Sequence, residues 1–325
     1  MKTIRKTYIA LALAIPCLLL LACNDEWTDE QYEKTVSFVK SGYTDVYLKY
    51  RENGVAPYKI PLVVSGSTAN DQDVVVTVAL DPDTLVDLNL DRFRNRTDLY
   101  FKMLEPEYYD LKSTTATIPA GADVGLLDID FKLQGLDLVD KYILPLKIKA
   151  TSAHAPSPRK WYKKTMMRII PFNDFSGNYI PTNATIYWGD PNNPSSTAYE
   201  EHREARVVDS STVFFYAGLI QEQALNRALY KVRMRFNPDN TLTLTADSAR
   251  IQFSQIGDGN YEIKTETDPT IPYLEQRYTI ISMAYQFIDL TNPTDPIGYQ
   301  VQCRMTMERK RNTLIPEEDQ QFIFD

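Results

Sequence analysis

The sequence offers few residues whose types and spacing could carry out catalysis. His202 lies in the run EEHRE at residues 200–204, where a histidine and several carboxylates could bind a metal ion or transfer protons. A charged, solvated strand or loop is the interpretation we favour, because one histidine beside acids lacks convergent ligands. The pair Glu317 and Glu318 could serve glycoside hydrolysis, which needs two carboxylates at a fixed separation, but any acidic protein offers such pairs.

Other catalytic signatures are missing from the sequence. It contains no Gly-rich phosphate loop, no nucleophile elbow, no HExxH and no paired CxxC. Cys303 alternates with apolar residues, which is typical of a small core residue and not of a nucleophile. We therefore expect a protein that is not an enzyme, with no catalytic residues, no metal site and no cofactor.

Composition and charge exclude further classes. The chain of 325 residues is 43% hydrophobic and 24% charged, which excludes a wholly disordered chain and a protein with many membrane spans. Its net charge is -8, and because phosphates need clustered cations we expect no nucleic-acid partner. The 21 tyrosines favour strands over helices.

The N-terminus predicts export. Lys2, Arg5 and Lys6 form a basic segment, and residues 7–22 are uncharged and mostly apolar. This apolar segment is short for a membrane span and is followed at once by acidic residues, so we expect a signal peptide over residues 1–22.

The signal peptide ends in a sequence that resembles a lipobox. Residues 20–23 read LLAC, similar to the cleavage site of bacterial lipoproteins, in which the cysteine carries the lipid. The resemblance implies lipidation at Cys23; an ordinary signal peptide with an accidental cysteine is the alternative. The acidic stretch that follows resembles the export signal of surface lipoproteins of Bacteroidota, which implies an outer-membrane protein facing the cell exterior. A solvated tether is the alternative reading of the same acids.

Hydrophobic alternation predicts strands in the first half of the mature chain. Leu127, Ile129 and Phe131 alternate with Asp128 and Asp130, the pattern of a half-buried antiparallel strand. Similar alternation recurs in several other segments, and turn residues separate them, which together predict an antiparallel sandwich. A short helix is expected from Leu85 to Arg96.

The second half predicts long strands after a linker at residues 171–174. Strands of this number and length suggest a closed antiparallel barrel, because closure removes exposed edges. We expect strands over the following segments: 178–188, 205–217, 228–236, 241–245, 261–265, 277–288 and 299–309. A short helical lid is expected from Gln221 to Ala228.

Short motifs carry a family resemblance. The segment 58–150 resembles the N-terminal β-sandwich family numbered 1735 among domains of unknown function, found in surface lipoproteins of Bacteroidota. The motifs are IPLVVSG at 60–66, YYDL at 108–111, TIPAG at 117–121 and YILPL at 142–146. The second half, which opens FSGNY at 175–179 and closes MTMER at 305–309, is similar to the lipocalin-like domains that follow this sandwich.

The expected fold class is all-β, with an Ig-like antiparallel β-sandwich followed by a lipocalin-like antiparallel β-barrel. We expect four segments: a signal peptide (1–22), a lipidated acidic tether (23–34), the sandwich domain (35–172) and the barrel domain (173–325). The resemblance implies a glycan-binding accessory of a starch-utilisation-type (Sus-like) polysaccharide import system, with a glycan, the outer membrane and a TonB-dependent import complex as partners. A structural or protein-interaction role, as a spacer or adhesin component, is the alternative.

Aromatic residues beside loops are the candidate glycan contacts, because sugars place apolar C–H faces on aromatic rings. The candidates lie at a strand end or beside loops of the second half: Trp188, Tyr187, Tyr199 and Tyr273. Trp188 could equally plug the barrel end as a core residue, because tryptophan is mostly buried.

Overall fold

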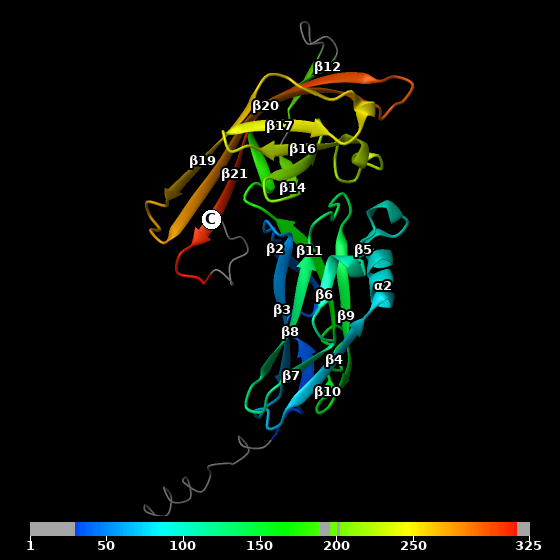
Figure 1. Cartoon of the computed structure of the whole chain (residues 1–325). Helices are drawn as coiled ribbons and strands as arrows, with labels where there is room; N and C mark the ends of the chain where they lie inside the picture. The colour runs from blue at the N-terminus through cyan, green and yellow to red at the C-terminus, as the bar shows by residue number, and fades with distance from the viewer. Residues whose placement is uncertain (1–29, 189–195, 200–201, 317–325) are drawn as a thin grey trace, which may run out of the picture.

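The computed structural model describes residues 30–188, 196–199 and 202–316, and 53% of these described residues lie in strands. Two sheets face each other in the N-terminal part, and an eight-stranded closed barrel forms the C-terminal part (Figure 1). The predicted all-β fold, a sandwich followed by a barrel, is confirmed. The predicted signal peptide and Cys23 lie outside the described residues, and no helix within the described ranges is long and apolar enough to cross a membrane.

The sandwich consists of two sheets whose strands alternate along the chain. One sheet has the order β10 (Ala155–Pro156), β1 (Thr35–Phe38), β3 (Val55–Ser65), β8 (Val124–Lys132) and β6 (Tyr109–Leu111). The other has the order β2 (Gly42–Lys49), β11 (Lys164–Phe172), β9 (Tyr142–Thr151), β4 (Val74–Leu80) and β7 (Thr115–Ile118), with β5 (Lys102–Met103) beside β9. The pairs β1–β10, β2–β11 and β5–β9 are parallel, so the sandwich is less uniformly antiparallel than the sequence predicts.

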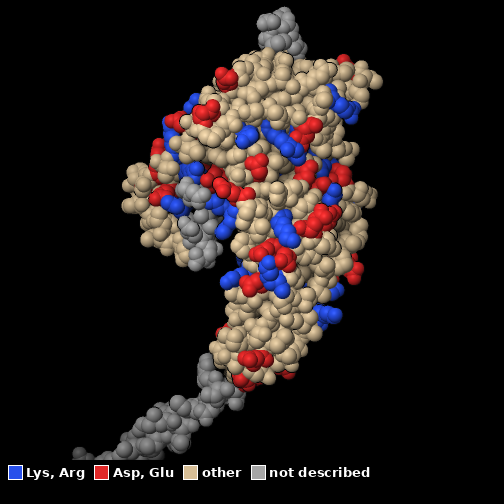
Figure 2. Space-filling model, in the orientation of Figure 1, with Lys and Arg blue, Asp and Glu red and all other residues tan. Residues whose placement is uncertain are grey.

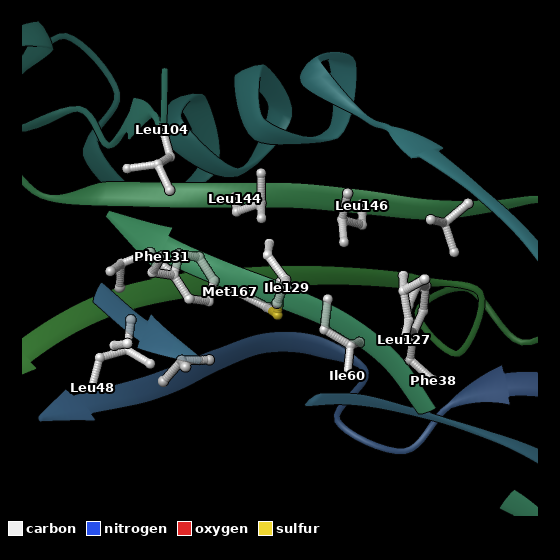
Figure 3. Close-up of a cluster of buried hydrophobic side chains, with 14 of the residues drawn as sticks. Phe38, Leu48, Ile60, Leu104, Leu127, Ile129, Phe131, Leu144, Leu146 and Met167 are labelled. Carbon is white, nitrogen blue, oxygen red and sulfur yellow. The ribbon is translucent and has the colours of Figure 1, made fainter. Parts of the chain in front are cut away.

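The core of the sandwich lies between the sheets. Leu127, Ile129 and Phe131 of β8 are at most 1% exposed, as their alternation predicts. They face Leu144 and Met167 of the opposite sheet (Figure 3). Each fully buried side chain of this size contributes about 1.5–3 kcal/mol.

One α-helix, α2 (Pro82–Phe93), packs beside β9. It begins three residues before the predicted start, because Pro82 is preorganised for the first helical turn. It ends at Phe93, before Arg94 takes a positive φ of 51°. The short helices η2 (Thr97–Leu99) and η3 (Pro106–Tyr108) follow.

The barrel is a meander in which every strand pairs with the next. Its strands are β12 (Gly177–Trp188), β14 (Arg203–Val207), β15 (Thr212–Tyr216), β16 (Lys231–Phe236), β17 (Thr241–Ala246), β19 (Gly259–Thr267), β20 (Leu274–Asp289) and β21 (Ile297–Asn312). Pairing of β21 with β12 closes the barrel. The strands β13 (Ser196–Tyr199) and β18 (Ser254–Gln255) and the short helices η4 (Arg227–Tyr230) and η5 (Ala249–Ile251) lie outside this ring. Cys303 faces the interior and is 7% exposed, as its alternation predicts.

Two predictions for the barrel, the strand at 205–217 and the helical lid at 221–228, are wrong. The expected strand from 205 to 217 is the hairpin β14–β15, whose turn is fixed by a hydrogen bond from the Ser211 amide to Asp209 Oδ1 at 2.9 Å. The expected lid from Gln221 to Ala228 forms turns that lead into η4, because tertiary contacts override helix propensity here.

Hydrogen bonds and a hydrophobic contact hold the sandwich and the barrel together where the chain passes from one to the other. The expected linker begins too early, since β11 continues to Phe172. Asn173 donates to the carbonyl of Asp209 at 2.7 Å, and Arg309 of β21 donates to the carbonyl of Asn173 at 2.6 Å. Phe214 of β15 is 1% exposed and packs with the sandwich core. The barrel and the sandwich therefore share a hydrophobic contact.

Candidate functional site

The predicted aromatic residues Tyr187 and Trp188 end β12 and point to opposite sides of the barrel wall. Trp188 lies on the side of the buried Ile186 and is half-buried. Its ring meets Tyr299 edge-on at 6.4 Å, and Tyr299 stacks on Phe287 at 5.5 Å. Trp188 is thus part of an aromatic cluster at this end of the barrel.

Tyr187 faces outward, where it lines a shallow groove of about 380 Å³ on the barrel wall. Asn183 and Thr185 of the same strand lie beside it, and Gln302 and Arg304 of β21 extend the groove. Polar side chains therefore line much of the groove, which crosses neighbouring strands of one continuous sheet and is bordered by the loop at residues 256–258.

The other two predicted aromatic residues do not join this group as far as the structure describes them. The backbone of Tyr199 pairs with Thr185, but its side chain lies outside the described set. Tyr273 is 43% exposed and lies next to the start of β20. Trp188 pairs with Tyr299, which pairs in turn with Phe287 near the end of β20. The start of β20 and Phe287 are on the order of 40 Å apart along the strand. The structure thus does not bring Tyr273 to the same end of the barrel.

A larger cavity, about 720 Å³, opens where the barrel meets the sandwich. The sandwich contributes two cations and the barrel contributes β14, β15 and the loop that follows: Lys141, Arg168, His202, Arg203, Glu204, Arg206, Phe214, Phe215, Tyr216, Gly218, Leu219, Ile220, Gln221, Glu222 and Gln223. We call this space the junction cavity. Figure 2 shows basic and acidic side chains gathered over this part of the molecule.

Strand alternation positions the polar wall of the junction cavity. On β14, Glu204 and Arg206 face away from the barrel interior, while Ala205 is buried between them. On β15, Phe214 lies directly opposite Arg206, and Tyr216 follows on the same face. Charged and aromatic side chains therefore share one surface that faces the sandwich.

Arg206 is at the centre of an ion-pair network. Its Nη2 lies 2.6 Å from carboxylate oxygens of both Glu204 and Glu222. Its Nη1 donates to Tyr216 Oη at 3.3 Å, and Lys141 Nζ lies 3.4 Å from Glu222. Burial raises the pKa of Tyr216 to about 12, so its phenol stays neutral and able to donate and accept.

The charges of the network respond to burial and to one another. Burial opposes ionisation of Glu204, but Arg206 outweighs it and lowers the pKa of this carboxyl. Burial likewise opposes the charge on Arg206, yet Glu204 and Glu222 raise its pKa. Both partners are therefore held ionised, and the wall of the cavity is preorganised.

The junction cavity suits ligand binding by hydrogen bonds and ring contacts. Its volume lies within the roughly 300–1,000 Å³ typical of small-molecule sites. Among the described residues, no group of three or more histidine, cysteine, aspartate and glutamate side chains is arranged to hold a metal ion. Of the cavity residues, the sequence drew attention to His202 and the acids beside it; His202 is exposed and lies directly before β14. The alternation of charged and aromatic residues on β14 and β15 was the signal available for the residues of these two strands.

Comparison with protein families gives two matches. Residues 27–152 match a domain of unknown function, DUF4973, and residues 163–306 match a family described as a C-terminal domain ("-like, C-terminal"). The family that matches the N-terminal part is thus DUF4973, whereas the sequence motifs predicted family 1735. The comparison with curated proteins found no match.

Solved structures from Bacteroides are similar over nearly the whole chain. A protein of unknown function from Bacteroides ovatus is 37% identical, with a TM-score of 0.82, and the alignment covers 89% of this chain and 100% of that one. A multidomain protein including DUF1735, also from B. ovatus, is 37% identical, with a TM-score of 0.80, covering 89% and 99%.

A third structure carries a functional description. It is an auxiliary nutrient binding protein from Bacteroides thetaiotaomicron, 33% identical, with a TM-score of 0.77, and the alignment covers 86% of this chain and 95% of that one. None of the three descriptions names an enzymatic activity. The match to DUF4973 covers most of the sandwich of this chain and the second match covers most of its barrel, and the chain belongs to this family of Bacteroides proteins.

Proposed function

We propose that this protein is a nutrient-binding protein that captures an oligo- or polysaccharide in the junction cavity and does no chemistry on it. The observation that carries the proposal is the cavity of about 720 Å³, in which fixed hydrogen-bonding groups lie beside the partly exposed ring of Tyr216. Sugars need both, because their hydroxyls pair with polar side chains while their C–H faces lie on rings.

The relative described as an auxiliary nutrient binding protein supports this role. It is similar across both the sandwich and the barrel, so it shares the junction between them. A ligand held at that junction would contact side chains from both parts of the chain, which favours a function specific to this two-part architecture.

The sequence extends the proposal to location and partners. The lipobox-like ending at Cys23 supports a lipid anchor in the outer membrane, and the acidic tether supports display toward the cell exterior. There the protein would pass its glycan to a TonB-dependent import complex. Replacing Cys23 by Ser tests the anchor: the variant should take up no labelled palmitate and leave the membrane fraction, and a variant that is still labelled and membrane-bound contradicts it.

A glycan array tests the captured ligand. The chain from Asn24 onward contains every described residue and should bind a defined set of saccharides on the array. Isothermal titration calorimetry with the best saccharide then gives the affinity, and chromatography of the same sample should recover the saccharide intact. Failure to bind any saccharide contradicts glycan capture, and cleavage of the ligand contradicts binding without chemistry.

A further inference from the structure

The junction cavity is lined by more cations than anions, although the chain as a whole has a net charge of -8. Its walls carry four basic side chains, Lys141, Arg168, Arg203 and Arg206. They carry two carboxylates, Glu204 and Glu222. A concave, partly buried surface with an excess of one charge attracts ligands of the opposite charge.

Two of the four cations have close contacts with the protein's own oxygens. Arg206 binds both Glu204 and Glu222 at 2.6 Å. Arg203 is 4% exposed and donates to the backbone carbonyls of Tyr216 and Gly218, with its guanidinium over the Phe215 ring at 4.7 Å. These two arginines hold the wall in place.

Lys141 and Arg168 have longer contacts. Lys141 lies 3.4 Å from Glu222, which Arg206 already binds. Arg168 lies 3.5 Å from Tyr43 Oη and 3.7 Å from Asp45. Ordinary charge-assisted hydrogen bonds are about 2.7–2.9 Å, so both cations can gain from an additional anionic partner.

The electrostatics around Lys141 point the same way. Burial lowers its pKa, and although Glu222 opposes this shift, Arg206 and Arg168 add to it. The lysine is therefore charged at some cost, which comes first from burial and then from the two arginines, and a bound anion would relieve that cost. Arg168 adds a planar fork, which suits the paired oxygens of a carboxylate or sulfate.

We propose that the saccharide captured in the junction cavity is anionic, and that Lys141 and Arg168 bind its carboxylate or sulfate ester. The proposal rests on the glycan-binding function above and names the class of glycan. Tyr216 and Leu219 line the same cavity and offer a ring and an aliphatic side chain for the apolar C–H faces of the sugar that bears the charge.

Paired polymers separate the charge from the sugar. Polygalacturonate and its methyl ester share one backbone and differ in their carboxylate charge. Chondroitin sulfate and its desulfated form, which keeps its uronate carboxylates, differ in the sulfate alone. The chain from Asn24 onward should bind polygalacturonate or chondroitin sulfate at least tenfold more tightly than the counterpart that lacks the carboxylate or sulfate charge, by calorimetry. Its affinity should fall as salt rises, because salt screens the ion pairs.

Charge-removing variants locate the contact. Lys141→Gln and Arg168→Gln should each weaken binding of the charged polymer at least tenfold. Arg235→Gln, which removes the same charge from the exposed outer face of β16, should bind like the unaltered protein. Melting temperatures of all three variants show whether a loss reflects unfolding.

The outcomes distinguish the two proposals. Equal binding of charged and esterified polymers, or loss in Arg235→Gln as large as in Arg168→Gln, overturns the anionic class. Binding of neutral saccharides alone overturns it too, but leaves glycan capture standing. If neither these polymers nor any array saccharide binds, both proposals fall.

Discussion

The junction cavity and the outer-barrel groove are both polar, but they are built in different ways. In the cavity, the Arg206 and Glu222 side chains are 13% and 18% exposed and are fixed by bonds to several elements. In the groove, Asn183, Gln302 and Arg304 are exposed residues of one continuous barrel wall. The difference shows that a single wall gives a shallow surface, whereas two packed parts give a preorganised cavity.

The largest expected effect comes from the hydrophobic contact beneath the cavity. Phe214→Ala should lower the free energy of unfolding by about 3–5 kcal/mol, because the ring is buried against the sandwich core. Ile180→Ala, at a residue that is 64% exposed on the barrel, should cost under about 0.5 kcal/mol. Urea unfolding of both variants measures the contrast. A similar small cost for both would show that the contact between barrel and sandwich contributes little.

The ion-pair network should give the next largest effect. Arg206→Gln removes the shared partner of Glu204 and Glu222 and should cost about 1–3 kcal/mol, because two carboxylates are left without it. Adding Glu222→Gln to this variant should recover part of the loss, since it removes one of those charges. Chemical denaturation of the two single variants and the double variant gives the coupling; strictly additive losses would contradict a network.

Alkaline pH should weaken the cavity wall in a defined range. Burial raises the pKa of Tyr216 to about 12, so the folded protein keeps a neutral phenol that the unfolded chain ionises near pH 10. Its contribution to stability is present below about pH 10 and is lost as the pH rises toward 12. Between pH 9 and 12, the melting temperature of Tyr216→Phe should fall less steeply than that of the unaltered protein. Identical slopes of melting temperature against pH for the two proteins would contradict this contribution of Tyr216.

The smallest effect is expected in the groove. Tyr187→Ala should change the free energy of unfolding by less than about 0.5 kcal/mol, because the side chain lies on the outer face of the barrel. Its glycan affinity should also match that of the unaltered protein. A tenfold loss of affinity at an unchanged melting temperature would instead assign the glycan to the groove.

The fold was largely predictable because strand alternation reports burial directly. Leu127, Ile129 and Phe131 are buried as their spacing predicts. The hairpin β14–β15 was missed because a short polar turn at Asp209 to Ser211 interrupts an apolar run without glycine or proline.

The junction cavity was not predictable from local pattern. Lys141, Arg168 and Glu222 are far apart in the sequence, and only the packing of barrel on sandwich brings them together. Trp188 shows the converse: its position at a strand end was clear, but its edge-on contact with Tyr299 depends on the pairing of β12 with β21.

The most direct test of the central claim, that the glycan binds in the junction cavity, is to fill the cavity. Leu219 lines it and is 51% exposed, whereas Leu225, in the same loop, is 77% exposed and lies outside the lining. Calorimetry with the best saccharide from the array should show that Leu219→Trp weakens binding at least tenfold, about 1.4 kcal/mol, while Leu225→Trp binds normally. Unchanged affinity in Leu219→Trp, at an unchanged melting temperature, would contradict the assignment.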